Sequence, residues 1–159
     1  MRILVFSDTH GRTERMLDVI RETPHDMVVH LGDCVADARR IEAEFPDENL
    51  RYVAGNDLYD VMSRTPTRAL FAAGRIAVMA VHGHDYSVRA TMSKLYETAK
   101  SLSVALVLYG HTHVPRVDTH DGVTMFSPGS CSLDRSRTGN SWGLVEVEGE
   151  KVKCQIMYF

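Results

Sequence analysis

The first two-thirds of the chain alternate short apolar runs with amphipathic segments. The apolar runs are rich in β-branched residues and have the length of buried strands. They cover residues 3–6, 27–29, 50–54, 76–81 and 104–109. Between them, apolar side chains recur at helical spacing in residues 13–20, 38–45 and 95–102. Strands that alternate with helical crossovers pair in parallel, so this pattern predicts an α/β fold.

The last third of the chain predicts antiparallel strands instead. Asp121-Gly122 is a two-residue hairpin signal, and residues 117–120 and 123–126 flank it. A second, slightly longer loop contains Gly149 and lies between residues 143–148 and 152–157. We therefore expect two hairpins to close the fold.

Composition narrows the class of protein. With 44% hydrophobic residues and no linker-like segment, residues 1–159 are expected to form one domain with a real core. The net charge is −3 and no long basic run occurs, which argues against binding to long nucleic acid or to an anionic membrane. Three cysteines without CxxC spacing do not suggest a disulfide framework. The apolar run at residues 3–6 is too short for a signal peptide, so we expect a cytoplasmic protein.

Side chains that can bind a metal follow strand after strand. In chain order they are Asp8 and His10, then Asp33, then Asn56, then His82, and finally His111 and His113. The carboxyl ends of strands form the edge at which open α/β sheets bind ligands. Each residue alone has an ordinary alternative role, such as a helix N-cap for an Asp. These alternatives do not explain the shared edge, so the set taken together favours a metal site.

The ligand chemistry of this set is specific. It holds carboxylate, amide and imidazole groups but no thiolate, and this mixture suits manganese, iron, zinc or nickel better than calcium. Seven side chains exceed the needs of one tetrahedral zinc but suit two ions that share a carboxylate. Two ions about 3.5–4 Å apart are the usual apparatus for displacement at phosphorus. The pattern therefore predicts a hydrolase of phosphate esters.

Several short motifs carry a family resemblance. They are Asp8-Thr9-His10, Gly32-Asp33, Gly55-Asn56-Asp57, His82-Gly83-His84, Gly110-His111-Thr112-His113 and, further on, Ser127-Pro128-Gly129-Ser130. In this order they resemble the motifs of the calcineurin-like metallophosphoesterases over nearly the whole chain. The length and the wording of the motifs are most similar to the compact prokaryotic phosphodiesterase branch of that family.

The resemblance implies a fold and a ligand assignment. The fold is a four-layer αββα sandwich, in which two mixed β-sheets pack face to face between helices. Two divalent metal ions are implied, with manganese favoured and nickel, zinc, iron or magnesium as alternatives. Asp8, His10 and His113 would hold one ion, Asn56, His82 and His111 the other, and Asp33 would bridge them. A bridging water or hydroxide would be the nucleophile, because two cations lower its pKa.

The sequence departs from the family pattern at one position. Asp57 stands where many members have a histidine that protonates the leaving group. His84 is a candidate for the missing acid, with a structural hydrogen bond as the alternative; Asp57 is a candidate for orienting a ligand or capping a helix. We expect faster hydrolysis of activated aryl diesters than of alkyl esters, because general acid catalysis typically contributes ~10²–10⁴-fold.

The leading functional hypothesis is a metal-dependent phosphodiesterase that acts on small nucleotide-like or phospholipid-derived diesters. A phosphomonoesterase or pyrophosphohydrolase is an alternative, since the same two ions serve all three reactions. Another is a non-catalytic scaffold, the role of a eukaryotic trafficking subunit with this fold. The complete ligand set favours catalysis.

Other residues have less specific roles. Residues 86–92 and 132–140 are expected to shape the substrate pocket. Arg12, Arg135 and Arg137 are candidates for contact with phosphate, with solvated surface charge as the alternative. Apolar residues near the C-terminus, Ile156, Met157 and Phe159, are interpreted as core or as the contact surface of a homo-oligomer.

Overall fold

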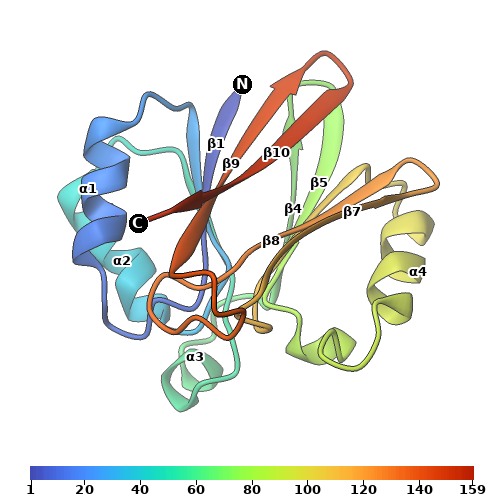
Figure 1. The fold of residues 1–159 in the computed structure, drawn as a ribbon. Helices are drawn as coiled ribbons and strands as arrows, with labels where there is room; N and C mark the ends of the chain where they lie inside the picture. The colour runs from blue at the N-terminus through green and yellow to red at the C-terminus, as the bar shows by residue number, and fades with distance from the viewer.

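Two mixed five-stranded β-sheets pack face to face in the computed structural model, which describes residues 1–159 (Figure 1). The first sheet has the order β10-β9-β1-β2-β3. Its strands are β1 (Arg2–Phe6), β2 (Met27–His30), β3 (Leu50–Tyr52), β9 (Ser141–Glu148) and β10 (Lys151–Tyr158). The second sheet has the order β4-β5-β6-β8-β7. Its strands are β4 (Arg68–Ala73), β5 (Ile76–Val81), β6 (Leu106–Tyr109), β7 (Pro115–His120) and β8 (Val123–Pro128).

Helices cover the outer faces of both sheets. On the first sheet these are α1 (Glu14–Glu22) and α2 (Val35–Glu44), and on the second sheet α4 (Ser93–Ser101) (Figure 1). Two short helices, α3 (Leu58–Met62) and the 3₁₀ helix η1 (His84–Tyr86), lie in loops that follow strands. The four-layer αββα arrangement expected from the resemblance is therefore confirmed. No helix has both the length and the apolar character needed to cross a membrane.

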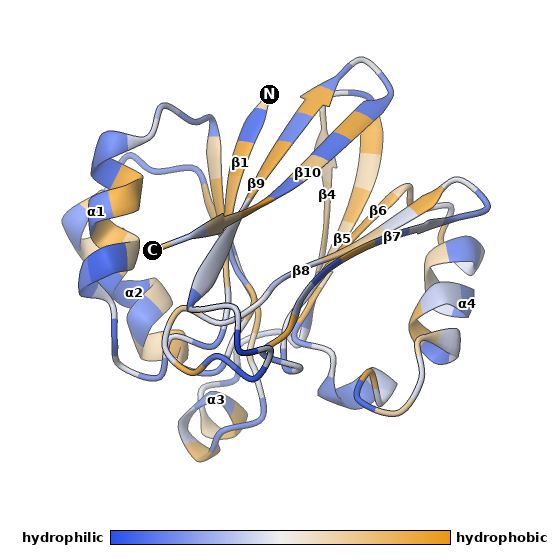
Figure 2. Ribbon diagram, viewed as in Figure 1, coloured by the Kyte–Doolittle hydropathy of each residue, from blue (hydrophilic) through white to orange (hydrophobic).

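The continuous apolar strands reflect burial on both of their faces. In β1, Ile3 and Val5 point into the core between the sheets, whereas Leu4 and Phe6 pack in the layer beneath α1 and α2. Because both faces exclude water, the strand has no polar alternation. Figure 2 shows the apolar character of β1 and β5, with polar residues on the outward sides of the helices.

The C-terminal strand adds to these cores. Ile156 packs against the core between the sheets, and Met157 and Phe159 pack against the layer that holds α1 and α2. Of the two interpretations of these residues, a core role is the one that the structure supports.

Pairing directions follow the sequence pattern with one exception. β1, β2 and β3 are parallel, as are β5, β6 and β8, and both C-terminal hairpins are antiparallel. The exception is β4, which the pattern did not predict and which pairs antiparallel with β5. Residues 69–73 are apolar, but three of these five are alanines and none is β-branched, so the segment lacks the composition of a typical strand. The five apolar strands predicted in the first two-thirds of the chain belong to two sheets rather than to one: β1, β2 and β3 to the first, β5 and β6 to the second.

Helix α3 was also not predicted from the sequence. It has five residues, and its apolar side chains Leu58, Val61 and Met62 are exposed. A helix that short and turned outward carries no amphipathic period for the sequence to reveal.

The two sheets pack closely where Gly143 of β9 faces Phe126 of β8. A Cβ atom on Gly143 would lie 2.4 Å from Cε1 and 2.6 Å from Cζ of Phe126, which is fully buried in the facing sheet. We predict that Gly143→Ala lowers the free energy of unfolding by about 1–3 kcal/mol, the usual cost of overpacking a core. Urea titration of the native protein and the variant measures this. In a Phe126→Leu background the same substitution should cost less, and an equal cost in both backgrounds would contradict the contact.

A buried histidine ends strand β2. The Nδ1 of His30 accepts the N–H of Gly32 at 3.3 Å, so its Nε2 carries the proton and donates to Thr9 Oγ1 at 3.0 Å. Burial lowers the pKa of His30 from 6.5 to about 4. The imidazole is therefore neutral in the folded protein at neutral pH.

This histidine predicts a loss of stability in mild acid. Between pH 6.5 and about 4 the unfolded chain binds a proton that folded His30 does not. The free energy of unfolding therefore decreases as the pH is lowered through this range. The loss is about 1.4 kcal/mol per pH unit. Urea titrations in EDTA at pH 7.5 and pH 5 should show a smaller loss for His30→Gln than for the native protein. An identical pH dependence in both proteins would contradict the prediction.

Candidate metal centre

The carboxyl ends of the parallel strands from both sheets meet at one end of the sandwich. From the first sheet come Asp8 and His10 after β1, Asp33 after β2 and Asn56 after β3; from the second come His82 after β5 and His111 and His113 after β6. The sequence placed these residues on one shared edge. In the structure they come from the edges of two sheets, which meet at this end of the sandwich.

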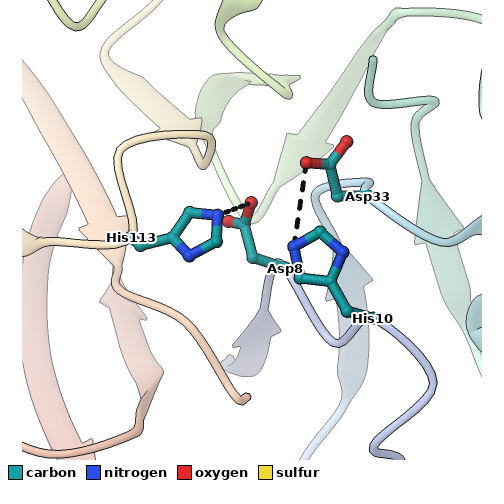
Figure 3. A group of neighbouring side chains, drawn as sticks. All are labelled: Asp8, His10, Asp33 and His113. Atoms are coloured by element: carbon teal, nitrogen blue, oxygen red, sulfur yellow. Dashed lines mark ion pairs between the residues drawn. The ribbon is translucent and has the colours of Figure 1, made fainter. Parts of the chain in front are cut away.

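Four of these residues form a first cluster. The ligand atoms of Asp8, His10, Asp33 and His113 all lie within 4.8 Å of one another (Figure 3). His113 Nε2 is 3.0 Å from Asp8 Oδ1, and His10 Nε2 is 3.9 Å from Asp33 Oδ2. Figure 3 shows both imidazoles turned toward the carboxylates.

A second cluster shares one member with the first. Asp33, His82 and His111 offer ligand atoms within 4.8 Å of one another. His82 Nε2 lies 3.3 Å from Asp33 Oδ1 and 3.2 Å from His111 Nδ1. Asp33 thus turns Oδ2 toward His10 and Oδ1 toward His82. One carboxylate stands between two groups of ligands.

Five of these residues have a left-handed backbone. The φ angle is 54° at Asp8, 45° at His10, 53° at Asp33, 67° at His111 and 59° at His113. Few residues other than glycine adopt this conformation, and it persists where the surrounding structure holds it. Around Asp8 that structure is provided by Ser130 and Ser132, whose hydroxyls donate to the Asp8 carbonyl at 2.9 and 2.8 Å.

Two glycines leave room for the carboxylates. A Cβ atom on Gly55 would lie 2.1 Å from Asp33 Oδ1. One on Gly110 would lie 2.0 Å from Ser7 Oγ, whose hydroxyl donates to Asp8 at 2.5 Å. Both glycines therefore allow the backbone to approach these buried polar groups closely.

Backbone carbonyls select the tautomer of two histidines. His82 Nδ1 lies 2.7 Å from the carbonyl oxygen of Leu31, and His113 Nδ1 lies 2.8 Å from that of Leu133. A carbonyl only accepts, so Nδ1 carries the proton in each ring. Nε2 is therefore the nitrogen that faces the carboxylates: protonated, it pairs with them, and deprotonated, it offers its lone pair to a metal ion, which is how metal-binding histidines are commonly oriented.

Both carboxylates are ionised despite their burial. Burial raises the pKa of Asp8, but His113, His82 and the Ser7 hydroxyl outweigh it and hold that pKa below its ordinary value. The pKa of Asp33 is likewise lowered against burial, chiefly by His82 and the N–H of Asn56. Burial lowers the pKa of His111 to about 4. That ring is neutral at pH 7 and offers a lone pair.

One buried oxygen shows that these residues fit a cation. Asp8 is fully buried, and its Oδ1 has no hydrogen-bond partner even though His113 is near. A buried anionic oxygen without a partner is costly. Divalent metal ions remove that cost, since they bind deprotonated carboxylates and neutral imidazoles.

A further carboxylate supports the site from behind. Asp60 accepts the N–H of Val35 and of Gly55, both at 2.6 Å, and thereby ties together the loops that follow β2 and β3. Its own N–H donates to Asp57 Oδ1 at 2.8 Å, so Asp57 caps α3. Of the two roles considered for Asp57, helix capping is confirmed. No sequence signal marks Asp60, because its partners lie on separate loops.

An open cleft of about 550 Å³ is lined by His10, Asp33 and His113 of the first cluster and by Asn56, whereas His82 and His111 are not among its lining residues. Leu133 is the one apolar residue among its ten lining residues. Arg12 and Arg135 line it as the sequence suggested, whereas Arg137 is not among the lining residues and Arg89 had not been considered. Both expected segments, residues 86–92 and 132–140, contribute to the cleft. A larger groove of about 810 Å³ beside Met1 holds none of the candidate ligands.

His84 lies beside the second cluster. Its ring centroid is 5.5 Å from that of His82 and 6.2 Å from that of His111. Its Nδ1 is buried without a hydrogen-bond partner, and the residue is not among those that line the cleft. A role for His84 as a general acid stays a prediction.

Comparison with known proteins agrees with this geometry. A protein of Mycoplasma pneumoniae named "Probable metallophosphoesterase" is 31% identical over 139 residues, which are 85% of this chain and 82% of the relative. A crystal structure from Streptococcus pneumoniae, described as a predicted phosphoesterase, superposes with a TM-score of 0.85 and 27% identity, covering 99% of this chain and 88% of the other.

Vps29 from Entamoeba histolytica has the same fold, with a TM-score of 0.77, 21% identity and coverage of 100% of this chain and 99% of the other. A family model described as the calcineurin-like phosphoesterase superfamily domain matches residues 1–150. This chain therefore belongs to the calcineurin-like phosphoesterase superfamily.

Proposed function

We propose that this chain is a phosphodiesterase that uses two divalent metal ions. The observation that carries the proposal is the position of Asp33 between the two ligand clusters, with one carboxylate oxygen turned toward each. Bound there, two divalent cations would neutralise phosphoryl oxygens and activate water for attack at phosphorus. The mixed oxygen and nitrogen ligands suit manganese among the available metals.

In this proposal each cluster holds one ion. Asp8, His10 and His113 hold the first, and His82 and His111 hold the second. Asn56 completes the second set, because it lines the same cleft and its N–H donates to Asp33 Oδ1 at 2.8 Å. Asp33 serves both.

Arg89 is proposed to act at the second cluster. Its Nε and Nη2 both donate to the carbonyl oxygen of His111, at 3.2 and 2.9 Å. This anchor fixes the loop that carries His111 and leaves the positive charge of the guanidinium at the cleft. A cation held there favours an anionic phosphate ester.

A scaffold with the same fold would have no use for this arrangement. The chain retains all seven candidate ligands, and the partnerless oxygen of Asp8 costs free energy in the absence of a cation. This cost favours catalysis over a scaffold role.

Metal dependence tests the proposal directly. Metal-stripped protein should hydrolyse neither bis(p-nitrophenyl) phosphate nor p-nitrophenyl phosphate, and manganese, nickel, zinc or magnesium should restore activity, chiefly on the diester. His82→Ala and Asn56→Ala should each lower the restored rate by more than about 100-fold, since even residues that only support ligands contribute about 10–100-fold. His120→Ala, on the exposed part of β7, is the matched control and should keep native activity.

Other outcomes of this experiment would change the assignment. A preference for the monoester would make the chain a phosphomonoesterase with the same centre. Two bound ions per chain without hydrolysis of either ester would contradict the phosphodiesterase proposal and favour a scaffold.

The nature of the leaving group tests the role of position 57. With Asp57 engaged as the cap of α3, the alcohol must leave without help from that residue. We expect aryl diesters to react much faster than alkyl esters at saturating metal; equal rates would contradict this. If His84 donates the proton, His84→Ala should slow alkyl esters by ~10²–10⁴-fold and aryl esters far less. Unchanged rates and pH dependence would remove His84 from the mechanism.

A further inference from the structure

Two arginines on one wall of the cleft have no acidic partner. Arg12 Nη1 donates to the carbonyl oxygen of Ser132 at 3.2 Å. The backbone N–H of Arg135 donates to the carbonyl of His113 at 3.3 Å, and its side chain makes no hydrogen bond or ion pair.

These two arginines lie beside the first ligand cluster. Ser132 lines the cleft with them; its carbonyl accepts from Arg12, and its hydroxyl donates to the carbonyl of Asp8. Leu133, next along the chain, accepts from His113 Nδ1. Arg89 is anchored instead to His111 of the second cluster. The cleft therefore has positive charge on two sides, and Arg89 already serves the side of His111.

The carbonyl oxygen of Ser132 holds the guanidinium of Arg12 without neutralising its charge. A hydrogen bond to a neutral carbonyl holds the guanidinium in place but leaves its charge uncompensated and most of its N–H donors free. Arginine offers a planar fork that matches the oxygens of a phosphate. A cleft of about 550 Å³ with one apolar lining residue suits a polar ligand larger than a single phosphate.

We propose that Arg12 and Arg135 form a subsite for a second phosphate group of the substrate, next to the phosphate that is hydrolysed. The proposal rests on the phosphodiesterase function proposed above and names its substrate class. The substrate is a phosphodiester that carries a further phosphate elsewhere in the molecule. The two arginines discriminate such compounds from diesters with a single charge.

Two substrates with the same scissile bond test this subsite. Thymidine 5′-(p-nitrophenyl phosphate) has one phosphate, and its 3′-phosphorylated form has two. The native protein, saturated with manganese, should show a KM about tenfold lower for the 3′-phosphorylated compound. Arg12→Gln and Arg135→Gln should each reduce that ratio, and the double variant should bring it close to one.

Arg137→Gln is the matched control. Arg137 lies on the same loop and is exposed, but it does not line the cleft, so its loss should leave the KM ratio at the native value. A ratio near one in the native protein would overturn the subsite. An equal fall of the ratio in the Arg137 variant would do so as well, because it would reveal only general surface charge.

A binding measurement separates this proposal from the proposed function. Calorimetry should show that thymidine 3′,5′-bisphosphate binds more tightly than thymidine 5′-monophosphate, and that Arg12→Gln with Arg135→Gln removes the difference. If this result holds while neither ester is hydrolysed, the subsite stands and the phosphodiesterase proposal fails. If both esters are hydrolysed with equal KM and both nucleotides bind equally, the function stands and the subsite fails.

Discussion

Two ionised carboxylates buried at the junction of the sheets are the constraint around which this structure is arranged. Asp8 and Asp33 keep lowered pKa values although burial opposes their ionisation. Their charge is balanced by neighbouring imidazoles and by N–H and O–H donors, yet one oxygen of Asp8 stays without a partner. A bound cation would provide the missing partner for this oxygen. Metal binding and stability are therefore coupled in this chain, since an occupied site removes a cost of the folded state.

The supporting structure comes from parts of the chain that carry no ligand. Ser130 and Ser132, in the loop between β8 and β9, hold the carbonyl of Asp8. Asp60, behind the cleft, ties together the loops after β2 and β3. The C-terminal third thus does more than close the sandwich. It holds the strained backbone of the first ligand loop, and this explains physically why a motif around Ser127–Ser130 accompanies the ligand motifs.

The positive charge of the cleft comes from arginines on loops, which are the parts of the fold that set substrate preference. Family membership accounts for the ligand clusters, but the arginines that line the cleft come from three loops, after β1, β5 and β8. Loops are free to vary on a fixed scaffold, so substrate preference resides in them rather than in the strands. Asp57 also lies next to a candidate ligand, Asn56, and its side chain caps α3.

The sequence by itself determined the strands that are buried on both faces, the two C-terminal hairpins and the identity of the residues gathered at the site. These follow from local periodicity, turn chemistry and the repeated placement of ligands after strands. Only the tertiary structure decided how these strands divide between two sheets, because the apolar pattern of a strand does not say which neighbours it pairs with. Likewise, it alone revealed the roles of Asp60 and Arg89 in holding the ligand loops. Those features are contacts between distant loops, and local sequence carries no record of which loops meet.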